Sequence, residues 1–261
     1  MVQLIFEITW NCPCRCPFCP VPKINKILPL TDYKRILQLF KQHYSDRDYA
    51  VVLSGGEPGT VPSLKDYVDA ARELGYEVTI VTNAFNIENI LNSSPDLIEL
   101  SIDYFGERHD DARGVKGLFS NALRLLTLAT EMKIPVVIRS TLMKDNIRDI
   151  LELRSLLDLN GFNETPIIAM PVRGAPELRP SQQQIEELAE HKGIFISDNC
   201  PAGISSFVIT PDRDVLACIF YRKKLGQFKK FTKKELDEIL KEGAKIPRYP
   251  CENPTYNGIP S

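Results

Sequence analysis

The sequence predicts an α/β fold in which parallel strands form an open, partial (β/α)6 barrel. Two observations support this fold class. Through the first two-thirds of the chain, six short apolar runs alternate with stretches that carry apolar residues at helical spacing. Polar motifs also follow several of these runs, at the point where each strand would end. Strands that alternate with helices form a parallel sheet with right-handed crossovers, and six units are too few to close an eight-stranded barrel.

The expected strands and helices follow one another in regular order. Apolar, often β-branched runs predict strands at residues 4–8, 50–53, 77–81, 97–102, 135–142 and 166–170. Apolar residues at helical spacing predict helices at residues 32–43, 64–74, 86–91, 118–132 and 147–159. Thr31 is a candidate N-cap of the first helix, and Gly75 closes the second. Because ligands of such sheets bind at the carboxyl ends of the strands, we expect the functional site there.

The character of the chain changes after residue 173, where prolines bracket a loop. A helix is expected at residues 183–191, strands at 206–210 and 215–218, and a polar helix at 233–242. The two strands are joined by Pro211-Asp212-Arg213-Asp214, a composition typical of a hairpin turn. We therefore expect a barrel core over residues 1–175 and a small C-terminal extension, built from a β-hairpin and a helix, over residues 176–261.

Composition restricts the class of protein. The chain has 261 residues, a net charge of −2, 43% hydrophobic and 25% charged residues, as in an ordinary globular protein. This charge shows no bias toward nucleic acid or an anionic membrane. No stretch approaches the roughly 20 apolar residues of a membrane span, and the N-terminus lacks the basic leader of a signal peptide. We therefore expect a cytoplasmic protein, in which clustered cysteines indicate metal ligands or redox groups before disulfides.

Four of the seven cysteines stand in one short loop directly after the first expected strand: Cys12, Cys14, Cys16 and Cys19. The spacing of Cys12, Cys16 and Cys19 allows their thiolates to hold one iron–sulfur cluster, which normally takes four. Three ligands leave one iron open, and an open metal position is a place for chemistry. Cys14 has no place in this pattern, and we expect it not to be a ligand. A zinc knuckle that uses the same three cysteines and another group is the alternative.

This loop resembles the defining motif of the radical S-adenosylmethionine (SAM) superfamily, with Phe18 as the aromatic residue before the last cysteine. The resemblance implies a 4Fe–4S cluster whose open iron is chelated by the amino and carboxylate groups of SAM. It also implies that one electron from the reduced cluster splits SAM into methionine and a 5′-deoxyadenosyl radical. An external one-electron donor, similar to ferredoxin or flavodoxin, would then be a partner.

Further matches to the superfamily follow the second and third strands. Gly55-Gly56-Glu57-Pro58 stands where the family carries its GGEP motif. Glycines allow backbone to approach a ligand closely, and the strand-end carbonyls and Glu57 could accept hydrogen bonds from the methionine ammonium. Asn83 lies in a turn that resembles the family's Thr-Asn-Gly, although Ala84 replaces the glycine, so that backbone should be less free.

The fourth and fifth strands supply the remaining cofactor candidates. Ser101 and Asp103 end the fourth strand, and a histidine–aspartate pair and Arg113 follow, close to the family's order. The resemblance implies that Ser101 and Asp103 serve the ribose and that Arg113 serves the methionine carboxylate, a pairing that suits a planar guanidinium. Ser140 is a weaker ribose candidate, for which plain strand packing is the alternative. His109 is expected to stabilise its loop.

Three cysteines remain in the C-terminal extension: Cys200, Cys218 and Cys251. Their surroundings resemble the start of the SPASM or shortened twitch extension of radical SAM enzymes. The resemblance implies an auxiliary 4Fe–4S cluster held by these three cysteines, with a fourth position that is open or closed by a side chain such as Asp198. The alternative is that they are ordinary buried cysteines.

The resemblance implies an enzyme that abstracts hydrogen from its substrate, with the modification of a peptide or protein side chain as the leading reading. A small-molecule or cofactor-biosynthesis enzyme of the same superfamily is the second, and a non-enzymatic zinc- or cluster-binding module the third. No residue is assigned as a catalytic acid or base. Neither nucleic acid nor membrane is expected as a partner, and the substrate itself is not predicted.

Overall fold

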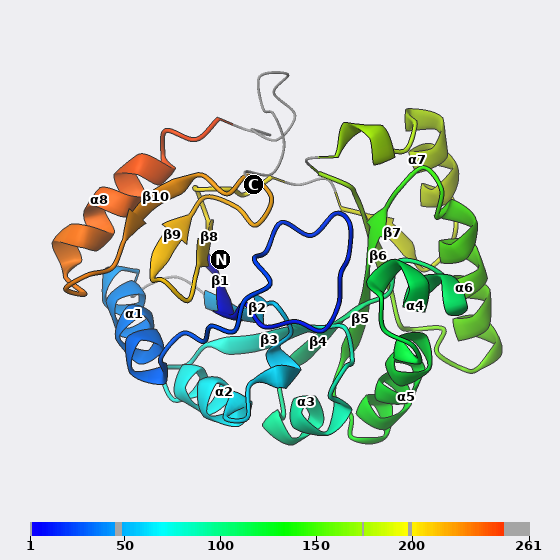
Figure 1. Cartoon of the computed structure of the whole chain (residues 1–261), viewed down its shortest axis with the longest axis horizontal. Coiled ribbons are helices and arrows are strands. Elements are labelled where there is room, and N and C mark those ends of the chain that lie inside the picture. The colour runs from blue at the N-terminus through cyan, green and yellow to red at the C-terminus, as the bar shows by residue number, and fades with distance from the viewer. Residues whose placement is uncertain (1, 45–48, 174, 198–199, 248–261) are drawn as a thin grey trace.

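The computed structural model describes residues 2–44, 49–173, 175–197 and 200–247. At its centre is one curved sheet of ten strands, and helices lie on the outside of the curve (Figure 1). The α/β class and the open, parallel barrel predicted from the sequence are therefore confirmed. Within the described residues, no helix is long and apolar enough to cross a membrane.

The strands are short and mostly parallel. They are β1 (Val2–Thr9), β2 (Tyr49–Gly55), β3 (Glu77–Thr82), β4 (Leu97–Ser101), β5 (Val136–Leu142), β6 (Ile167–Pro171), β7 (Ile194–Ile196), β8 (Ser206–Ile209), β9 (Asp214–Leu216) and β10 (Lys224–Gln227). Their order in the sheet is β10-β9-β8-β1-β2-β3-β4-β5-β6-β7. All pairs from β8 through β1 to β7 are parallel, whereas β8, β9 and β10 pair antiparallel.

The helices follow the expected order with small shifts at their ends. They are α1 (Leu30–His43), η1 (Pro58–Thr60), α2 (Leu64–Arg72), α3 (Ile87–Ser93), α4 (Glu107–Arg113), α5 (Leu118–Glu131), α6 (Ile147–Leu159), η2 (Pro176–Leu178), α7 (Gln182–Ala189) and α8 (Lys233–Gly243). The sequence pattern does not predict α4, because its residues, ERHDDAR, carry no apolar stripe.

One continuous apolar core fills the space between the sheet and the helices, and it includes residues from β1 to α8. Phe6 on β1 packs edge-on against Tyr33 on α1, which in turn contacts Tyr67 on α2. Alternate residues of each strand point to this core, and the others point inward to the lumen of the barrel. The sequence of β4 shows this alternation, since Ile98 and Leu100 are buried whereas Glu99 and Ser101 are partly exposed.

The C-terminal extension is part of the same sheet. The predicted hairpin is present as β8 and β9, with Val208 paired to Leu216. The structure adds that β8 lies beside β1, with Leu4 opposite Phe207, and that β7 extends the other edge. The division of the chain at residue 175 stays a prediction; strands from both sides of it share one sheet.

Candidate functional site

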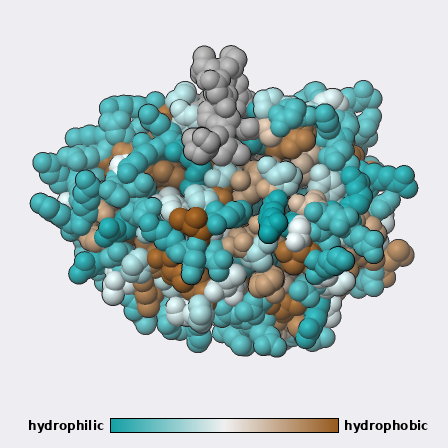
Figure 2. All heavy atoms as spheres, in the orientation of Figure 1, coloured by the Kyte–Doolittle hydropathy of each residue, from teal (hydrophilic) through white to brown (hydrophobic). Residues whose placement is uncertain are grey.

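A cavity of about 160 Å³ opens at the carboxyl ends of the central strands. The loop after β1, dark blue in Figure 1, lies across this mouth of the barrel. The face seen in Figure 2 is mainly hydrophilic at its margin, with hydrophobic residues nearer the middle. Among the residues that line the cavity are Cys12, Cys14, Cys16, Phe18, Cys19, Lys23, Gly55, Gly56, Glu57, Asn83, Ser101, Asp103, Arg113, Arg139, Thr141, Ile219 and Phe220. The structure thus brings most of the predicted cofactor residues to one place, and their roles stay predictions.

The cysteine loop supplies four sulfur atoms to this cavity. Cys14 is buried, and the side-chain amide of Asn83 lies 3.2 Å from its sulfur and 3.8 Å from that of Cys12. A hydrogen bond from the Cys14 thiol lowers the pKa of Cys12 to about 6 and that of Cys16 to about 7, against the effect of burial. The same contacts raise the pKa of Cys14. The expectation that Cys14 is not a ligand stays a prediction.

The donor set fits a cluster by its chemistry. Cys12, Cys16 and Cys19 are half-buried and free, and the cations of Lys23 and Arg113 stand close enough to lower the pKa values of Cys12 and Cys16. Nearby cations suit an anionic group made of thiolates, sulfide and iron. Among the described residues, no three cysteine, histidine, aspartate or glutamate side chains are placed to hold a single metal ion.

Gly55 and Gly56 join the β2 turn to the cysteine loop. Gly56 N donates to the Thr9 carbonyl at 2.6 Å, and Glu57 N donates to the Asn11 carbonyl at 2.8 Å. A Cβ atom on Gly56 would stand 2.1 Å from the Asn11 oxygen, and one on Gly55 would stand 2.2 Å from the Thr9 oxygen. The sequence predicts that these glycines let a ligand approach the backbone closely. In the structure, the atoms that approach them closely are the backbone oxygens of Thr9 and Asn11.

Glu57 is buried, and both of its carboxylate oxygens accept hydrogen bonds from the protein. Oε1 accepts from Gly59 N at 2.9 Å and from the Thr82 hydroxyl at 2.6 Å, and Oε2 accepts from Asn83 N at 2.8 Å. Burial raises the pKa of Glu57, and these hydrogen bonds oppose that effect. Glu57 therefore fixes the turns after β2 and β3 to each other, while Pro58 is buried in η1 and does not line the cavity.

Asp103 and Arg113 form a buried ion pair in the cavity wall. Arg113 Nη2 lies 2.6 Å and Nε 3.1 Å from Asp103 Oδ2, while Oδ1 accepts from Thr141 N at 2.8 Å. Burial alone would lower the pKa of Arg113, but the charge of Asp103 outweighs it and raises that pKa. His109 Nδ1 accepts from Asp103 N at 3.2 Å, so the histidine holds the end of β4, as expected.

The two serine candidates lie on opposite sides of the sheet. Ser101 lines the cavity, whereas Ser140 is fully buried and its hydroxyl donates to the Ile102 carbonyl. Because side chains alternate along a strand, the neighbours of Ser140 face the lumen instead: Arg139 and Thr141 line the cavity. Arg139 forms an ion pair with Glu99 on β4: Nη2 donates to Oε1 at 2.8 Å, and Nε donates to Oε2 at 3.1 Å. The alternation along β5 could have identified Arg139 and Thr141 from the sequence.

Phe18 anchors the far side of the cysteine loop. It is 9% exposed and packs with Met143 and Val172, which follow β5 and β6, in a small apolar cluster separate from the main core. This packing holds the loop across the barrel mouth. Phe18 therefore has a structural contact in addition to its position in the cavity wall.

The C-terminal segment closes one side of the cavity. Ile219 and Phe220, which the sequence does not predict, line it, and Cys218 accepts a hydrogen bond from Phe220 N at 3.4 Å. Cys200 and Cys218 are half-buried and free, and neither lines the cavity. Cys251 and Asp198 lie outside the described residues.

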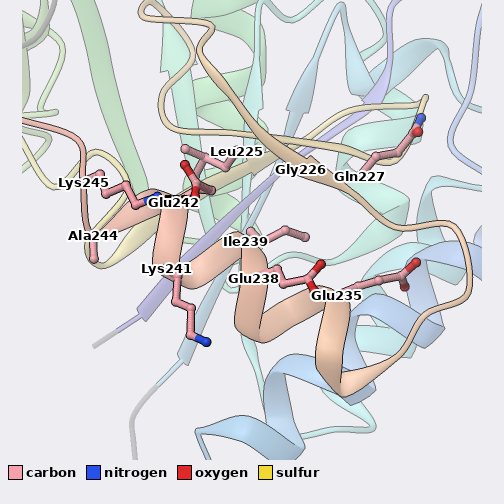
Figure 3. A pocket seen from close by; sticks show the side chains of 10 residues that line it. All are labelled: Leu225, Gly226, Gln227, Glu235, Glu238, Ile239, Lys241, Glu242, Ala244 and Lys245. Carbon is pink, nitrogen blue, oxygen red and sulfur yellow. Dashed lines mark hydrogen bonds and ion pairs between the residues drawn. The ribbon is translucent and has the colours of Figure 1, made fainter.

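A larger hollow of about 680 Å³ lies between β10 and α8 (Figure 3). Apolar Leu225 and Ile239 contribute to it, together with charged residues of α8 such as Glu235 and Lys241. None of its lining residues is a cysteine, and none belongs to a strand-end motif. The smaller cavity at the cysteine loop is therefore the candidate site.

Comparisons with known proteins agree with this geometry. A family model described as the radical SAM superfamily matches residues 6–157. The PqqA peptide cyclase of Rhizobium meliloti (strain 1021) is 25% identical over 226 residues, which are 77% of this chain and 59% of that protein. The Fe-coproporphyrin III synthase of Methanosarcina barkeri (strain Fusaro / DSM 804) is 36% identical over 115 residues, 41% of this chain and 28% of that protein. The chain thus spans less than two-thirds of the length of either relative.

Solved structures share the fold. Streptococcus suis SuiB bound to its precursor peptide SuiA superposes with a TM-score of 0.73 at 18% identity, over 99% of this chain and 66% of that one. Native anSMEcpe with bound AdoMet superposes with a TM-score of 0.69 at 14% identity, over 93% of this chain and 82% of that one. At these identities the likeness concerns the fold alone.

Proposed function

The chain belongs to the radical SAM superfamily, and from this premise we propose that it cleaves SAM reductively in order to modify a peptide or protein side chain. The observation that carries the proposal is the cavity at the barrel mouth. There Cys12, Cys16 and Cys19 stand together with residues of the motifs that follow β2, β3 and β4. Membership of the superfamily implies a 4Fe–4S cluster and SAM as cofactors.

The residues of this chain would act by binding and orienting the cofactors. Cys12, Cys16 and Cys19 would hold the cluster, which with SAM supplies a 5′-deoxyadenosyl radical that abstracts hydrogen. Arg113 is the candidate for the methionine carboxylate, and its pairing with Asp103 fixes the guanidinium in the cavity wall. Because Glu57 already binds the protein through both oxygens, the backbone carbonyls beside Gly55 and Gly56 are the better acceptors for the methionine ammonium.

A peptide substrate is supported by the peptides named for two of the similar proteins. One curated relative is a peptide cyclase, and one structural neighbour was solved with a precursor peptide. A small-molecule substrate is the second candidate, because the relative with the higher identity over a shorter segment is a synthase of Fe-coproporphyrin III. Binding of a porphyrin, seen as a change in its absorption spectrum, would favour the second candidate.

We further propose an auxiliary 4Fe–4S cluster at Cys200, Cys218 and Cys251, and an external one-electron donor of the ferredoxin or flavodoxin type. The support for the auxiliary cluster is the position of Cys218, directly before the Ile219–Phe220 wall of the cavity. A cluster there could accept the electron that the substrate gives up. A cytoplasmic location is favoured as well, because the six described cysteines are free and thiols stay reduced in that compartment.

The proposal is tested by measuring 5′-deoxyadenosine after anaerobic reconstitution with iron and sulfide. The wild-type chain, given dithionite and SAM, should release 5′-deoxyadenosine without substrate. Cys16→Ala should abolish the release because one ligand is lost, whereas Cys14→Ala should keep it. Equal loss in both variants would contradict the assignment of ligands. Iron analysis of Cys218→Ala, expected to lack the iron of one cluster, tests the auxiliary site in the same preparations.

A further inference from the structure

Lys23 brings an uncompensated positive charge to the cavity. Its Nζ lies 3.2 Å from the sulfur of Cys19 and donates a hydrogen bond to it. Three guanidinium groups in or beside the cavity each pair with a carboxylate: Arg113 with Asp103, Arg139 with Glu99 and Arg222 with Glu7. Lys23 forms no ion pair with any carboxylate of the described residues. Its charge is therefore directed at the sulfur atoms alone.

The backbone on both sides holds Lys23 in this place. Before it, Cys19 N donates to the Cys16 carbonyl at 3.2 Å, and Val21 is buried between two prolines, which restrict the backbone. After it, the Lys26 carbonyl accepts from Trp10 N at 2.9 Å and from the Thr9 hydroxyl at 3.0 Å. The segment is thus tied to the end of β1, so the side chain of Lys23 is brought back to the cysteine loop.

The ammonium of Lys23 is held at the cysteine loop by this hydrogen bond, although much of the side chain is exposed to solvent. Hydrogen bonds to the sulfurs and the local charge are among the features that set the potential of an iron–sulfur cluster. A fixed cation stabilises the reduced cluster more than the oxidised one, because reduction adds one negative charge.

We propose that Lys23 is a positioning residue that donates a charge-assisted hydrogen bond to the sulfur of Cys19 and raises the reduction potential of the cluster at Cys12, Cys16 and Cys19. The inference rests on the proposed function, since it needs a cluster at these cysteines. In the reduction step the cluster gains one electron from the external donor, which is oxidised. No covalent bond forms or breaks, and Lys23 keeps its proton.

The test is a reductive titration of the reconstituted protein, monitored by the EPR signal that responds to added SAM. Lys23→Met removes the charge and the donor but keeps an unbranched side chain that is one heavy atom shorter, and the midpoint of this variant should shift to a lower potential. Lys23→Arg should restore a midpoint near that of the wild type, because it keeps a cation and donors. Lys34→Met, which removes an exposed lysine of α1, is the matched control and should leave the midpoint unchanged. The shift should shrink at high salt, as expected for a partly exposed charge.

Three results would overturn the inference. One is an unchanged midpoint in Lys23→Met at an iron content equal to that of the wild type. Another is a shift in Lys23→Arg as large as that in Lys23→Met. The third is weaker SAM binding with no change in midpoint, which would make Lys23 an anchor for the cofactor carboxylate. Lys23→Gln is titrated in parallel, so that poor cluster loading in one variant does not decide the outcome. A wild-type chain that binds no cluster would instead contradict the proposed function.

Discussion

His109 illustrates how one buried side chain supports the site without taking part in its chemistry. It is fully buried, and its Nδ1 accepts a hydrogen bond from the backbone of Asp103, which in turn holds Arg113. Its Nε2 has no hydrogen-bond partner among the described residues. Burial lowers the pKa of His109 from 6.5 to about 4, with the charge of Arg113 acting in the same direction.

This pKa predicts a loss of stability in acid. Between pH 6.5 and 4 the unfolded chain binds a proton at His109 that the folded chain does not, so stability falls as the pH falls through this window. The loss should reach about 3 kcal/mol near pH 4. His109→Gln can keep an acceptor for Asp103 N but cannot ionise, so its stability should fall less over the same range. Urea unfolding at several pH values measures both proteins, and equal slopes would contradict the assignment to His109.

At the scale of elements, several turns adopt conformations that their residues do not favour. Ala84, in the turn after β3, has a φ of 65° in the left-handed region. The sequence predicts a less free backbone where the family has glycine, yet the turn keeps the glycine-like conformation, and Ala84 N donates to the Thr82 hydroxyl at 3.0 Å. The contacts of the turn therefore hold Ala84 in a left-handed conformation that alanine does not favour. A local sequence pattern does not show such contacts.

Lys133, after α5, offers a clean test of this kind of strain. Its φ is 58°, and Ile134 N donates to the Ala129 carbonyl at 2.8 Å, in the pattern that closes a helix around a glycine. Lys133 is exposed, so its side chain adds little packing. Lys133→Gly should stabilise the chain by about 1 kcal/mol in thermal or urea unfolding, because it relieves the left-handed strain. Lys133→Ala is the control; a gain as large as that of glycine would show that the strain is not the cause.

At the scale of the whole molecule, contacts between distant parts of the chain complete both the sheet and the site. β8 lies beside β1, although about 200 residues separate them. Arg222 Nη1 donates to Glu7 Oε1 at 2.6 Å, and Nη2 donates to Oε2 at 3.0 Å. Trp10 Nε1 also donates to Glu7 Oε2, at 2.7 Å. Glu7 is almost completely buried, so the barrel core depends on the C-terminal segment to compensate its charge.

This dependence predicts a large effect for a change far from β1 in the sequence. Arg222→Met should destabilise the chain by about 3 kcal/mol or more, because it leaves Glu7 buried without a cation. The matched control is Arg148→Met, which breaks the exposed pair with Glu152 on α6 and should cost less than about 1 kcal/mol. Urea unfolding measures both. A small and equal effect of the two changes would show that Glu7 does not need Arg222.

The sequence predicts much of the fold and part of the site, for physical reasons that particular residues show. The periodicity of apolar residues predicts the strands from β1 to β6, and the cysteine spacing after β1 predicts Cys12, Cys16 and Cys19 as ligands. Arg113 is predicted only from the resemblance to the order of the superfamily's motifs, since it ends α4 and not a strand. Sequence patterns do not identify β7, which has only three residues, or the place of β8 beside β1, which depends on long-range pairing. Lys23 is likewise missed, because only the path of its loop brings it to Cys19.

The EPR spectrum of the reduced, reconstituted protein with and without SAM shows directly whether SAM binds a cluster at the cysteine loop. We expect the signal of a reduced 4Fe–4S cluster that changes when SAM is added, because SAM binds the iron left open by three cysteines. Cys16→Ala should lack this SAM-dependent change, and Cys14→Ala should retain it. Protein that takes up zinc but no iron, or a cluster signal that saturating SAM leaves unchanged, would show that Cys12, Cys16 and Cys19 do not hold a SAM-binding cluster.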